Sequence, residues 1–225
     1  MPTTLTPELS RILGYFLGDG NIDKNSLRFR DERREVLEHY RHLFSQLFHV
    51  AGKIYPVAHK NCYQLSINSI AVRRLFEAML ENRFGLISRS SNDCIAEFIG
   101  GFMDAEGYVS KKRARISIGQ RDEEVLKYIQ MLLLRLNIRS QLHKVSTKDF
   151  HYLRFDNRDF LSFADRISVT AADKRALVSQ WQDEYESSQN DREVVPVDRK
   201  LVWDLVKSLG LKPSRFLTSR PECTY

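Results

Sequence analysis

The 225-residue sequence has no apolar run long enough to cross a membrane, and it contains few cysteines. Its start, residues 1–4, lacks the basic and apolar segments of a signal peptide, so we expect an intracellular protein with no membrane partner. The cysteines, Cys62, Cys94 and Cys223, are odd in number and widely spaced. This spacing argues against both a disulfide framework and a cysteine-based zinc site, and we expect reduced thiols.

A strong excess of one charge is also missing. The 35 Lys and Arg residues against 29 Asp and Glu give a net charge of +6, with a sequence pI of about 9.2. A basic balance of this size is compatible with a nucleic-acid partner but does not establish one. The 42% of hydrophobic residues is ordinary for a globular protein with a substantial core.

Against this background, one nine-residue pattern occurs twice. Residues 12–20 read ILGYFLGDG, and residues 99–107 read IGGFMDAEG. Each copy is apolar, ends in one acid followed by glycine, and has small residues four apart: Gly14 and Gly18 in the first copy, Gly101 and Ala105 in the second. A duplicated helix that delivers one carboxylate per copy, Asp19 and Glu106, indicates a pseudo-twofold protein with a two-carboxylate centre.

The residues around the two copies align as two repeats with an α+β pattern. Each repeat is predicted to contain the motif helix, a strand, an amphipathic helix, two extended segments and a closing helix. The helices are expected over 7–18, 31–48 and 70–81, and over 92–105, 121–136 and 158–167. The strands are expected over 27–30, 53–57 and 63–67, and over 113–118, 139–145 and 152–155. A further strand, or only a turn, follows each motif.

We divide the chain into a first repeat (1–88), a second repeat (89–170) and a helical C-terminal extension (171–225). The extension is predicted to hold helices over 171–186 and 198–209. Its first helix is expected either to cap the second repeat or to help the extension reach along a nucleic-acid backbone through Lys200, Lys207, Lys212 and Arg215.

The spacing of the small residues predicts how the two acids meet. Small side chains let two helices pack with their backbones nearly touching, which would bring Asp19 and Glu106 together. Two carboxylates about 5 Å apart repel by roughly 3 kcal/mol at an effective dielectric constant of about 20, and a helix C-terminus also disfavours an anion. Such a site needs a cation, and oxygen ligands favour magnesium or calcium over zinc. Paired carboxylates with divalent ions are suited to the attack of water on a phosphodiester.

Both copies resemble the LAGLIDADG motif of homing endonucleases, and residues 6–170 resemble the single-chain, two-repeat branch of that family. The second copy is the closer match, with Glu106 for the final aspartate, whereas the first has Leu17 where the motif usually has its earlier acid. The resemblance implies two αββαββα repeats that form a saddle of antiparallel sheets around the paired motif helices. It also implies a monomer that cuts both strands of a long asymmetric double-stranded DNA site across the minor groove. Mg²⁺ is the implied cofactor, and Ca²⁺ is expected to bind without supporting efficient cleavage.

The resemblance also implies roles for single residues. Asp19 and Glu106 are the implied metal ligands, and the preceding residues, Gly18 and Ala105, are included in the metal site. Gln120 resembles the polar residue that orients active-site water, and Asp31 is its counterpart in the first repeat. A basic side chain often lies near the metals in this family, and the sequence does not choose between the candidates Lys53, Arg121 and Lys144.

If the open faces of the sheets meet DNA, strand alternation identifies the contacting residues. In the first repeat they are Arg28, Arg30, Lys53, Tyr55, Gln64 and Ser66. In the second they are Arg113, Arg115, Ser117, Arg139, Gln141, His143 and Arg154. Lys111 and Lys112 lie in a predicted turn and are expected to hold phosphates, which adds affinity without sequence information.

Three functions are compatible with these residues. The leading one is an intron- or intein-associated DNA endonuclease, and the alternatives are an RNA maturase that binds intron RNA and a DNA-binding regulator that does not cleave. Because both acids are present, cleavage is favoured. The chain opens with Met1 and Pro2 and its end lacks a His-Asn pair, so self-splicing is not expected.

Overall fold

The computed structural model describes residues 2, 4–156, 158–188, 204 and 206–210. The chain divides into two compact units, Met1–Ser187 and Ser188–Tyr225. All the elements named below begin in the first unit. Among the described helices, none has both the length and the apolar character that a membrane crossing requires.

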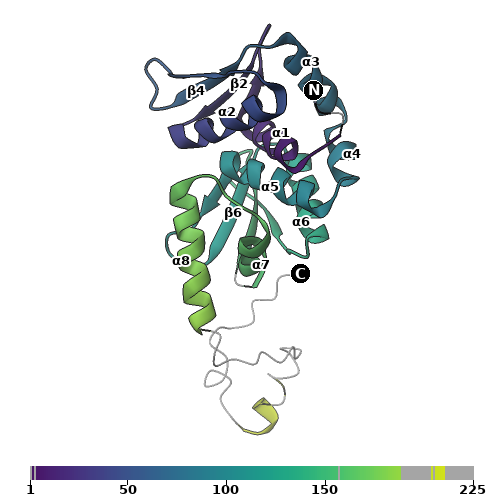
Figure 1. Cartoon of the computed structure of the whole chain (residues 1–225). Coiled ribbons are helices and arrows are strands. Elements are labelled where there is room, and N and C mark those ends of the chain that lie inside the picture. Colours follow the sequence, from purple (N-terminus) through teal and green to yellow (C-terminus); the bar gives the residue numbers. More distant parts are fainter. Residues whose placement is uncertain (1, 3, 157, 189–203, 205, 211–225) are drawn as a thin grey trace. The chain divides into compact units, whose positions relative to one another are not determined.

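The first unit contains two copies of the same order of elements (Figure 1). The first copy runs α1 (Pro7–Asp19), β1 (Gly20–Ile22), β2 (Leu27–Asp31), α2 (Arg34–Phe48), β3 (Lys53–Pro56), β4 (Tyr63–Ile67) and α3 (Ile70–Glu81). After α4 (Arg83–Ser88), the second copy runs α5 (Asn92–Glu106), β5 (Gly107–Val109), β6 (Arg115–Gln120), α6 (Glu123–Arg135), β7 (Gln141–Lys144), β8 (His151–Asp156) and α7 (Arg158–Arg166). Helix α8 (Ala172–Ser188) follows.

The strands form two antiparallel four-stranded sheets with matching topology. Their orders are β1-β2-β4-β3 and β5-β6-β8-β7. Figure 1 shows β2 and β4 on one side of the α1–α5 pair and β6 on the other. This arrangement confirms the predicted α+β saddle of two αββαββα repeats with the motif helices at its centre.

The motif helices begin at the residues that the sequence indicates. The Thr6 hydroxyl accepts a hydrogen bond from the Leu9 N–H at the start of α1, and the Ser91 hydroxyl accepts one from the Cys94 N–H at the start of α5. These side chains satisfy N–H groups that have no partner within the first turn of a helix. Local sequence therefore determines where both helices start.

Small residues allow α1 and α5 to pack backbone to backbone. A Cβ added to Gly14 would lie 1.9 Å from the Phe98 carbonyl oxygen, and one added to Gly101 would lie 2.0 Å from the Arg11 carbonyl oxygen. The same shift along the chain relates residues 14 to 101 and 11 to 98, so the two contacts are pseudo-twofold copies of each other. Only glycine fits at either position.

Several predicted boundaries are wrong. Asp31, expected in a helix, is the last residue of β2, and its side chain accepts the Arg33 N–H at 2.8 Å, which places the start of α2 at Arg34. Arg113 was expected in a strand, but it lies in the loop that the Ser110 N–H closes onto the Arg115 carbonyl. Arg139 also precedes its strand, because its N–H is bound to the Asp159 side chain.

Other predictions concern the cysteines and the tail. Cys62 and Cys94 are free, as expected, and Cys223 lies outside the described residues. The helix predicted over 171–186 is α8, whose Trp181 indole donates to the Ser110 carbonyl of the second repeat at 2.7 Å. Most of the helix predicted over 198–209 lies outside the described residues, as do Lys200, Lys212 and Arg215.

Candidate active site

The two motif acids end the two paired helices. Asp19 is the last residue of α1, and Glu106 is the last residue of α5. The final turns of these helices touch, since a Cβ on Gly18 would lie 2.6 Å from the Ala105 Cβ and 3.0 Å from the Glu106 Cγ. The structure therefore brings the acids to one end of the helix pair, together with Gly18 and Ala105.

Burial and like charge disfavour the ionised form of both acids. Burial, helped by the charge of Asp31, raises the pKa of Asp19 to about 6, although Lys174 and Arg33 oppose the rise. Burial raises the pKa of Glu106 to about 7, with Asp19 adding to the rise and Gln120 and Lys174 opposing it. Each carboxylate thus favours a nearby cation.

Gln120 holds one of the two acids directly. Its side-chain nitrogen donates to the Glu106 carboxylate at 3.0 Å, and its side-chain oxygen accepts the Arg121 N–H at 2.8 Å. The second contact turns the amide so that its NH₂ group faces Glu106. The observed contact orients the Glu106 carboxylate, whereas the role that the family resemblance implies for Gln120 is to orient active-site water.

Asp31 occupies the equivalent place in the first repeat but behaves differently. The glycine after each motif acid pairs with Phe29 in the first sheet and with Ile118 in the second. Asp31 lies two residues after Phe29, and Gln120 lies two residues after Ile118, so the two residues are equivalent. The buried Asp31 carboxylate accepts the Tyr15 hydroxyl at 3.0 Å and two Arg33 nitrogens at 2.9 and 3.0 Å. It raises the pKa of Asp19 instead of donating to that carboxylate. The two halves of the centre are therefore chemically unequal.

Asp19 opens onto two cavities. One, of about 500 Å³, is lined by Asp19, Arg30, Asp31, Glu32, Arg33, Cys62, Ala105 and Asp173. The other, of about 270 Å³, is lined by Gly18, Asp19, Gly20, Asn21, Arg28 and Arg30. The smaller cavity therefore lies between Asp19 and the β2 arginines, Arg28 and Arg30.

On the first sheet, only part of the expected DNA face is exposed. Strand register places Arg28 beside Ser66 and then Lys53, and places Arg30 beside Gln64 and then Tyr55. Arg30, Lys53 and Tyr55 are exposed, whereas Gln64 and Ser66 are only 4% and 7% exposed. Gln64 accepts from Arg30 at 3.0 Å and contacts the Tyr55 hydroxyl, so it organises its neighbours.

On the second sheet, one row across the strands consists of Tyr108, Ser117, Arg154 and Gln141. Arg154 donates to Gln141 at 3.0 Å, and Tyr108 is 58% exposed. Arg115 is held away from this row, because two of its nitrogens donate to Asp156 at 2.6 and 2.9 Å. Tyr108 and its first-repeat counterpart Asn21 were missed, since the sequence left β1 and β5 undecided between strand and turn.

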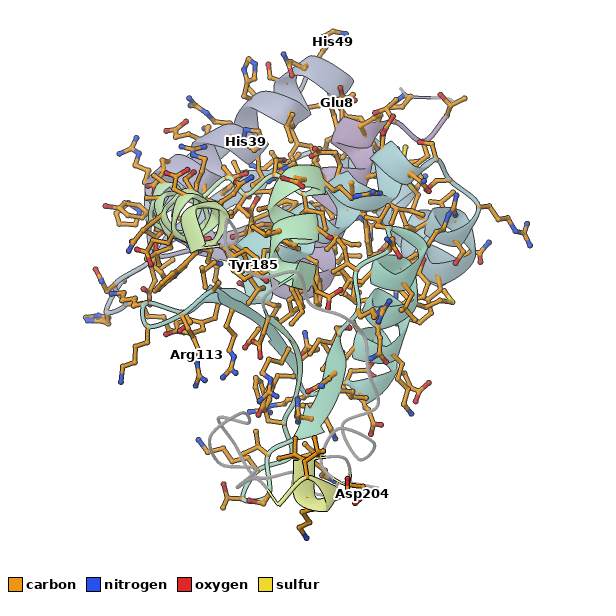
Figure 2. All side chains as sticks on the ribbon, turned by 90° about the horizontal axis from the view of Figure 1, so that it is seen from below. Glu8, His39, His49, Arg113, Tyr185 and Asp204 are labelled. Atoms are coloured by element: carbon orange, nitrogen blue, oxygen red, sulfur yellow. The ribbon has the colours of Figure 1, made fainter. Side chains whose placement is uncertain are left out.

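The remaining predicted contacts lie at the sheet edges. His143 stacks on Tyr152 with ring centroids 5.1 Å apart. Lys111 and Lys112 are exposed in the loop that follows β5. Figure 2 shows Arg113 projecting from the same loop. Arg139 lies outside β7, and its side chain borders a separate cavity of about 310 Å³.

Comparison with known families accounts for the duplication. The model of the LAGLIDADG-like domain matches residues 6–81 and matches again over residues 93–168. The chain belongs to the LAGLIDADG family. It carries two copies of that domain in one polypeptide, as the resemblance of its motifs predicted.

Two curated relatives match this LAGLIDADG chain over a small part of their own length. The glutamine–fructose-6-phosphate aminotransferase of Methanocaldococcus jannaschii is 36% identical over 189 residues, which make up 77% of this chain and 17% of that protein. A probable translation initiation factor IF-2 of the same organism is 27% identical over 142 residues, 59% of this chain and 12% of that protein. The chain therefore spans less than a fifth of these relatives.

Solved structures share the LAGLIDADG fold. I-DmoI in complex with DNA and Ca superposes with a TM-score of 0.61 at 21% identity, over 77% of this chain and 98% of that one. Full-length DUF199/WhiA from Thermatoga maritima also gives 0.61, at 16% identity, over 93% of this chain and 69% of that one. At these identities the likeness concerns the fold alone.

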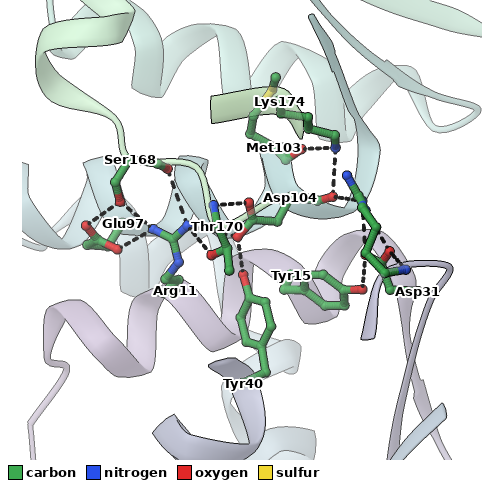
Figure 3. A network of polar contacts seen from close by, with 11 residues as sticks. Arg11, Tyr15, Asp31, Tyr40, Glu97, Met103, Asp104, Ser168, Thr170 and Lys174 are labelled. Carbon is green, nitrogen blue, oxygen red and sulfur yellow. Dashed lines mark hydrogen bonds and ion pairs between the residues drawn. The ribbon is translucent and has the colours of Figure 1, made fainter. Parts of the chain in front are cut away.

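The earlier acid of the LAGLIDADG motif, present only in α5, is part of a buried network (Figure 3). Asp104 is completely buried and accepts from Arg11 at 2.8 Å, from the Tyr40 hydroxyl at 2.8 Å and from the Thr170 N–H at 2.7 Å. Arg11 also contacts Glu97 and Ser168. On the pseudo-symmetric side, Leu17 and Phe98 occupy the equivalent positions, so the ion pair forms only once.

Two unexpected cations lie at the C-terminal end of the second LAGLIDADG helix. The buried ammonium group of Lys174 donates to the Met103 and Asp104 carbonyls at 2.9 Å each, and Arg33 donates to the Asp104 carbonyl at 3.2 Å. Burial lowers the pKa of Lys174 to about 8, with the charge of Arg33 adding to the effect. In the described part of the chain, no hydrogen bond or ion pair joins the predicted basic candidates, Lys53, Arg121 and Lys144, to Asp19 or Glu106.

No local signal distinguishes these two cations from other basic residues. Arg33 lies just before α2, and Lys174 lies in a helix beyond the second repeat. Both bind the Asp104 carbonyl, which is 71 residues from Arg33 and 70 residues from Lys174 along the sequence. Only the tertiary fold brings these side chains to the acids.

The LAGLIDADG acids provide part of a coordination shell for a divalent metal. Among the described residues, no group of three or more His, Cys, Asp or Glu side chains could hold an ion by itself. Asp19 and Glu106 nevertheless supply hard oxygen atoms, and burial together with a neighbouring carboxylate raises both pKa values. Magnesium commonly binds through one or two carboxylates, with waters and substrate phosphates completing its shell. The donor set therefore fits Mg²⁺ bound together with a phosphodiester.

Proposed function

We propose that the protein is a site-specific double-strand DNA endonuclease that depends on a divalent metal. The observation that carries this proposal is the meeting of Asp19 and Glu106 at the touching ends of α1 and α5. The homing endonuclease I-DmoI, whose structures include complexes with DNA and Mn or Ca, supports the choice of partner and metal.

Asp19 and Glu106 would hold Mg²⁺, which would polarise the phosphodiester and lower the pKa of attacking water. Gln120 fixes the Glu106 carboxylate through the 3.0 Å hydrogen bond. The buried helix pair keeps the acids in place, so the geometry exists before DNA binds. Calcium is proposed to occupy the same site without efficient cleavage.

DNA is proposed to lie across the outer faces of both sheets. The exposed side chains Arg30, Lys53 and Tyr55 would contact one half of the site, and Ser117, Arg154 and Gln141 the other. Lys111, Lys112 and Arg113 would contact phosphates. Since the halves come from unequal repeats, a single chain would recognise an asymmetric site. The chain is further proposed to act as an intracellular monomer. Its first repeat is proposed to end at residue 88, and its second repeat to span residues 89–170.

The range of curated relatives supports a mobile module. The relatives include an aminotransferase, an elongation factor 2 and an initiation factor, which are named for different activities. Each of them matches this chain over 17% or less of its own length. A segment common to such proteins is better explained by an inserted unit than by a shared activity. We therefore propose that the chain acts in intron or intein homing.

Cleavage of a randomised DNA library tests the proposal. Wild-type protein with Mg²⁺ should select and cut a limited set of sites in both strands, and EDTA should stop cutting. Asp19→Asn and Glu106→Gln should each slow cutting by at least about 100-fold, because losing a charged ligand removes several kcal/mol of stabilisation, while DNA binding in Ca²⁺ persists. Absence of cutting by the wild type on every library member would refute the endonuclease proposal, and full activity of both variants would refute the two-carboxylate centre.

A second candidate is DNA binding without cleavage. The observation in its favour is the fold shared with full-length DUF199/WhiA over 93% of this chain. This alternative predicts site-selective binding that Asp19→Asn leaves intact, with no cutting under any metal. The same library, scored for bound as well as cut DNA, separates the two functions, and an intron RNA added as competitor tests the maturase alternative.

A further inference from the structure

We propose that Lys174, in the helix that follows the second repeat, is a positioning residue of the catalytic centre. It holds the end of α5, on which Glu106 lies, and so makes α8 part of the cleavage machinery. This inference rests on the proposed endonuclease function, and it concerns a residue outside both family-matched segments, 6–81 and 93–168.

Four hydrogen bonds hold residues 170–181 against the second repeat. The Thr170 N–H donates to the Asp104 carboxylate at 2.7 Å, and the Lys174 ammonium donates to the Met103 and Asp104 carbonyls at 2.9 Å (Figure 3). The Trp181 indole then donates to the Ser110 carbonyl at 2.7 Å. Lys174 is only 9% exposed, so its charge is committed to this helix end rather than to solvent.

The contact is made at only one of the two motif helices. Phe16 and Leu17 of α1 are the counterparts of Met103 and Asp104 in the duplicated motif. In the described ranges, no side chain donates a hydrogen bond to the Phe16 or Leu17 carbonyl. Arg33 adds a second cation at α5, through its 3.2 Å bond to the Asp104 carbonyl. The cations therefore break the pseudo-twofold symmetry at the catalytic end of the helices.

A cation at this place has a clear physical effect. The last carbonyls of a helix lack partners within the helix and carry partial negative charge, and here the same end also bears the Glu106 carboxylate. Lys174 binds the Asp104 carbonyl and also the Met103 carbonyl, which already accepts the Gly107 N–H, and so keeps the final turn helical. Without it, the last turn is free to fray and Glu106 moves with it. Misplacing a catalytic group by about 1 Å can reduce a rate by about 100-fold.

The loss should affect the two DNA strands unequally. The strands meet a pseudo-twofold centre from opposite sides, so the ends of α1 and α5 have different relations to the two scissile bonds. A change confined to the α5 end therefore alters one cut more than the other. General weakening of the fold or of DNA binding would instead slow both cuts together.

The test compares Lys174→Met, which keeps the length of the side chain without its charge, with the wild-type chain. A cleavable duplex from the library carries a different label on each strand, and single-turnover cutting with Mg²⁺ gives one rate per strand. Lys127→Met is the matched control, because Lys127 is a half-exposed lysine that pairs with Glu123 and Glu124 on α6. If methionine prevents folding, as judged by circular dichroism, Lys174→Gln replaces it in the same measurement.

We expect the Lys174 variant to cut one strand 10- to 100-fold more slowly, as for outer-shell partners of metal ligands, and to accumulate nicked DNA. Its DNA affinity in Ca²⁺ should match that of the wild type, and the control should behave as wild type. Equal slowing of both strands, wild-type rates on both, or loss of DNA binding would overturn the positioning role. If the wild-type chain itself does not cut, the proposed function fails, which is a different and recognisable result.

Discussion

Replacing Arg11 by methionine tests the buried charge that joins the two motif helices. The side chains of Arg11 and Asp104 are 5% and 0% exposed, and their closest atoms are 2.8 Å apart. Removing one partner of a buried pair costs about 3–5 kcal/mol, because the other charge is left without compensation. Asp104 would keep the Tyr40 hydroxyl and the Thr170 N–H. We therefore expect Arg11→Met to lower the free energy of unfolding by about 3 kcal/mol.

A double-mutant cycle separates the charge effect from lost packing. Asp104→Asn alone should cost about 1–3 kcal/mol, since Arg11 keeps Glu97 while hydrogen bonds are disturbed. In the double variant no isolated buried charge remains. Its cost should therefore fall short of the summed single costs by about 2 kcal/mol.

Urea unfolding in EDTA, followed by circular dichroism near neutral pH, measures these values. The control is Arg34→Met, because Arg34 is 62% exposed and pairs with Glu38 at 3.4 Å, so its loss should cost about 0.5 kcal/mol or less. A cost below about 1 kcal/mol for Arg11→Met, or strictly additive single costs, would refute the reasoning.

The remaining predictions concern the acids, the helix contact and the DNA face. Burial raises the pKa of Asp19 to about 6 and of Glu106 to about 7, so the folded chain binds these protons more tightly than the unfolded chain. In EDTA, the free energy of unfolding of the wild type, measured relative to that of Asp19→Asn, should therefore fall by about 1 kcal/mol as the pH rises from about 4 to about 7, after allowance for solvent screening. A difference between the two proteins that does not change with pH would contradict this prediction. Gly101→Ala should destabilise by about 3 kcal/mol, since its Cβ would lie 2.0 Å from the Arg11 carbonyl oxygen; an unchanged urea midpoint would exclude this close contact. Gln120→Ala should raise the Mg²⁺ concentration needed for half-maximal cutting by about 10- to 100-fold, whereas an unchanged requirement would show that Gln120 does not orient Glu106. Arg154→Ala should relax sequence preference in the half-site bound by the second sheet, and a uniform loss of affinity across all sequences would assign it to phosphate instead.

Local patterns in the sequence were enough to predict the positions of several helices. Thr6 and Ser91 cap the motif helices, and the closing helix over 70–81 matches α3. These features depend on residues within a few positions of each other, where capping and hydrophobic periodicity act directly. The duplicated small-residue spacing also predicted the close helix pair, because the steric room for the contact is written into each helix separately.

The tertiary structure alone decided which residues surround the acids. Lys174 and Arg33 reach the Asp104 carbonyl from segments 70 and 71 residues away, and no local pattern marks them. Asp31 was expected to start a helix, but its contacts with Tyr15 and Arg33 hold it at a strand end. The two copies of the motif in the sequence thus determined that Asp19 and Glu106 meet. Long-range packing determined that the residues around these two acids differ in charge between the two repeats.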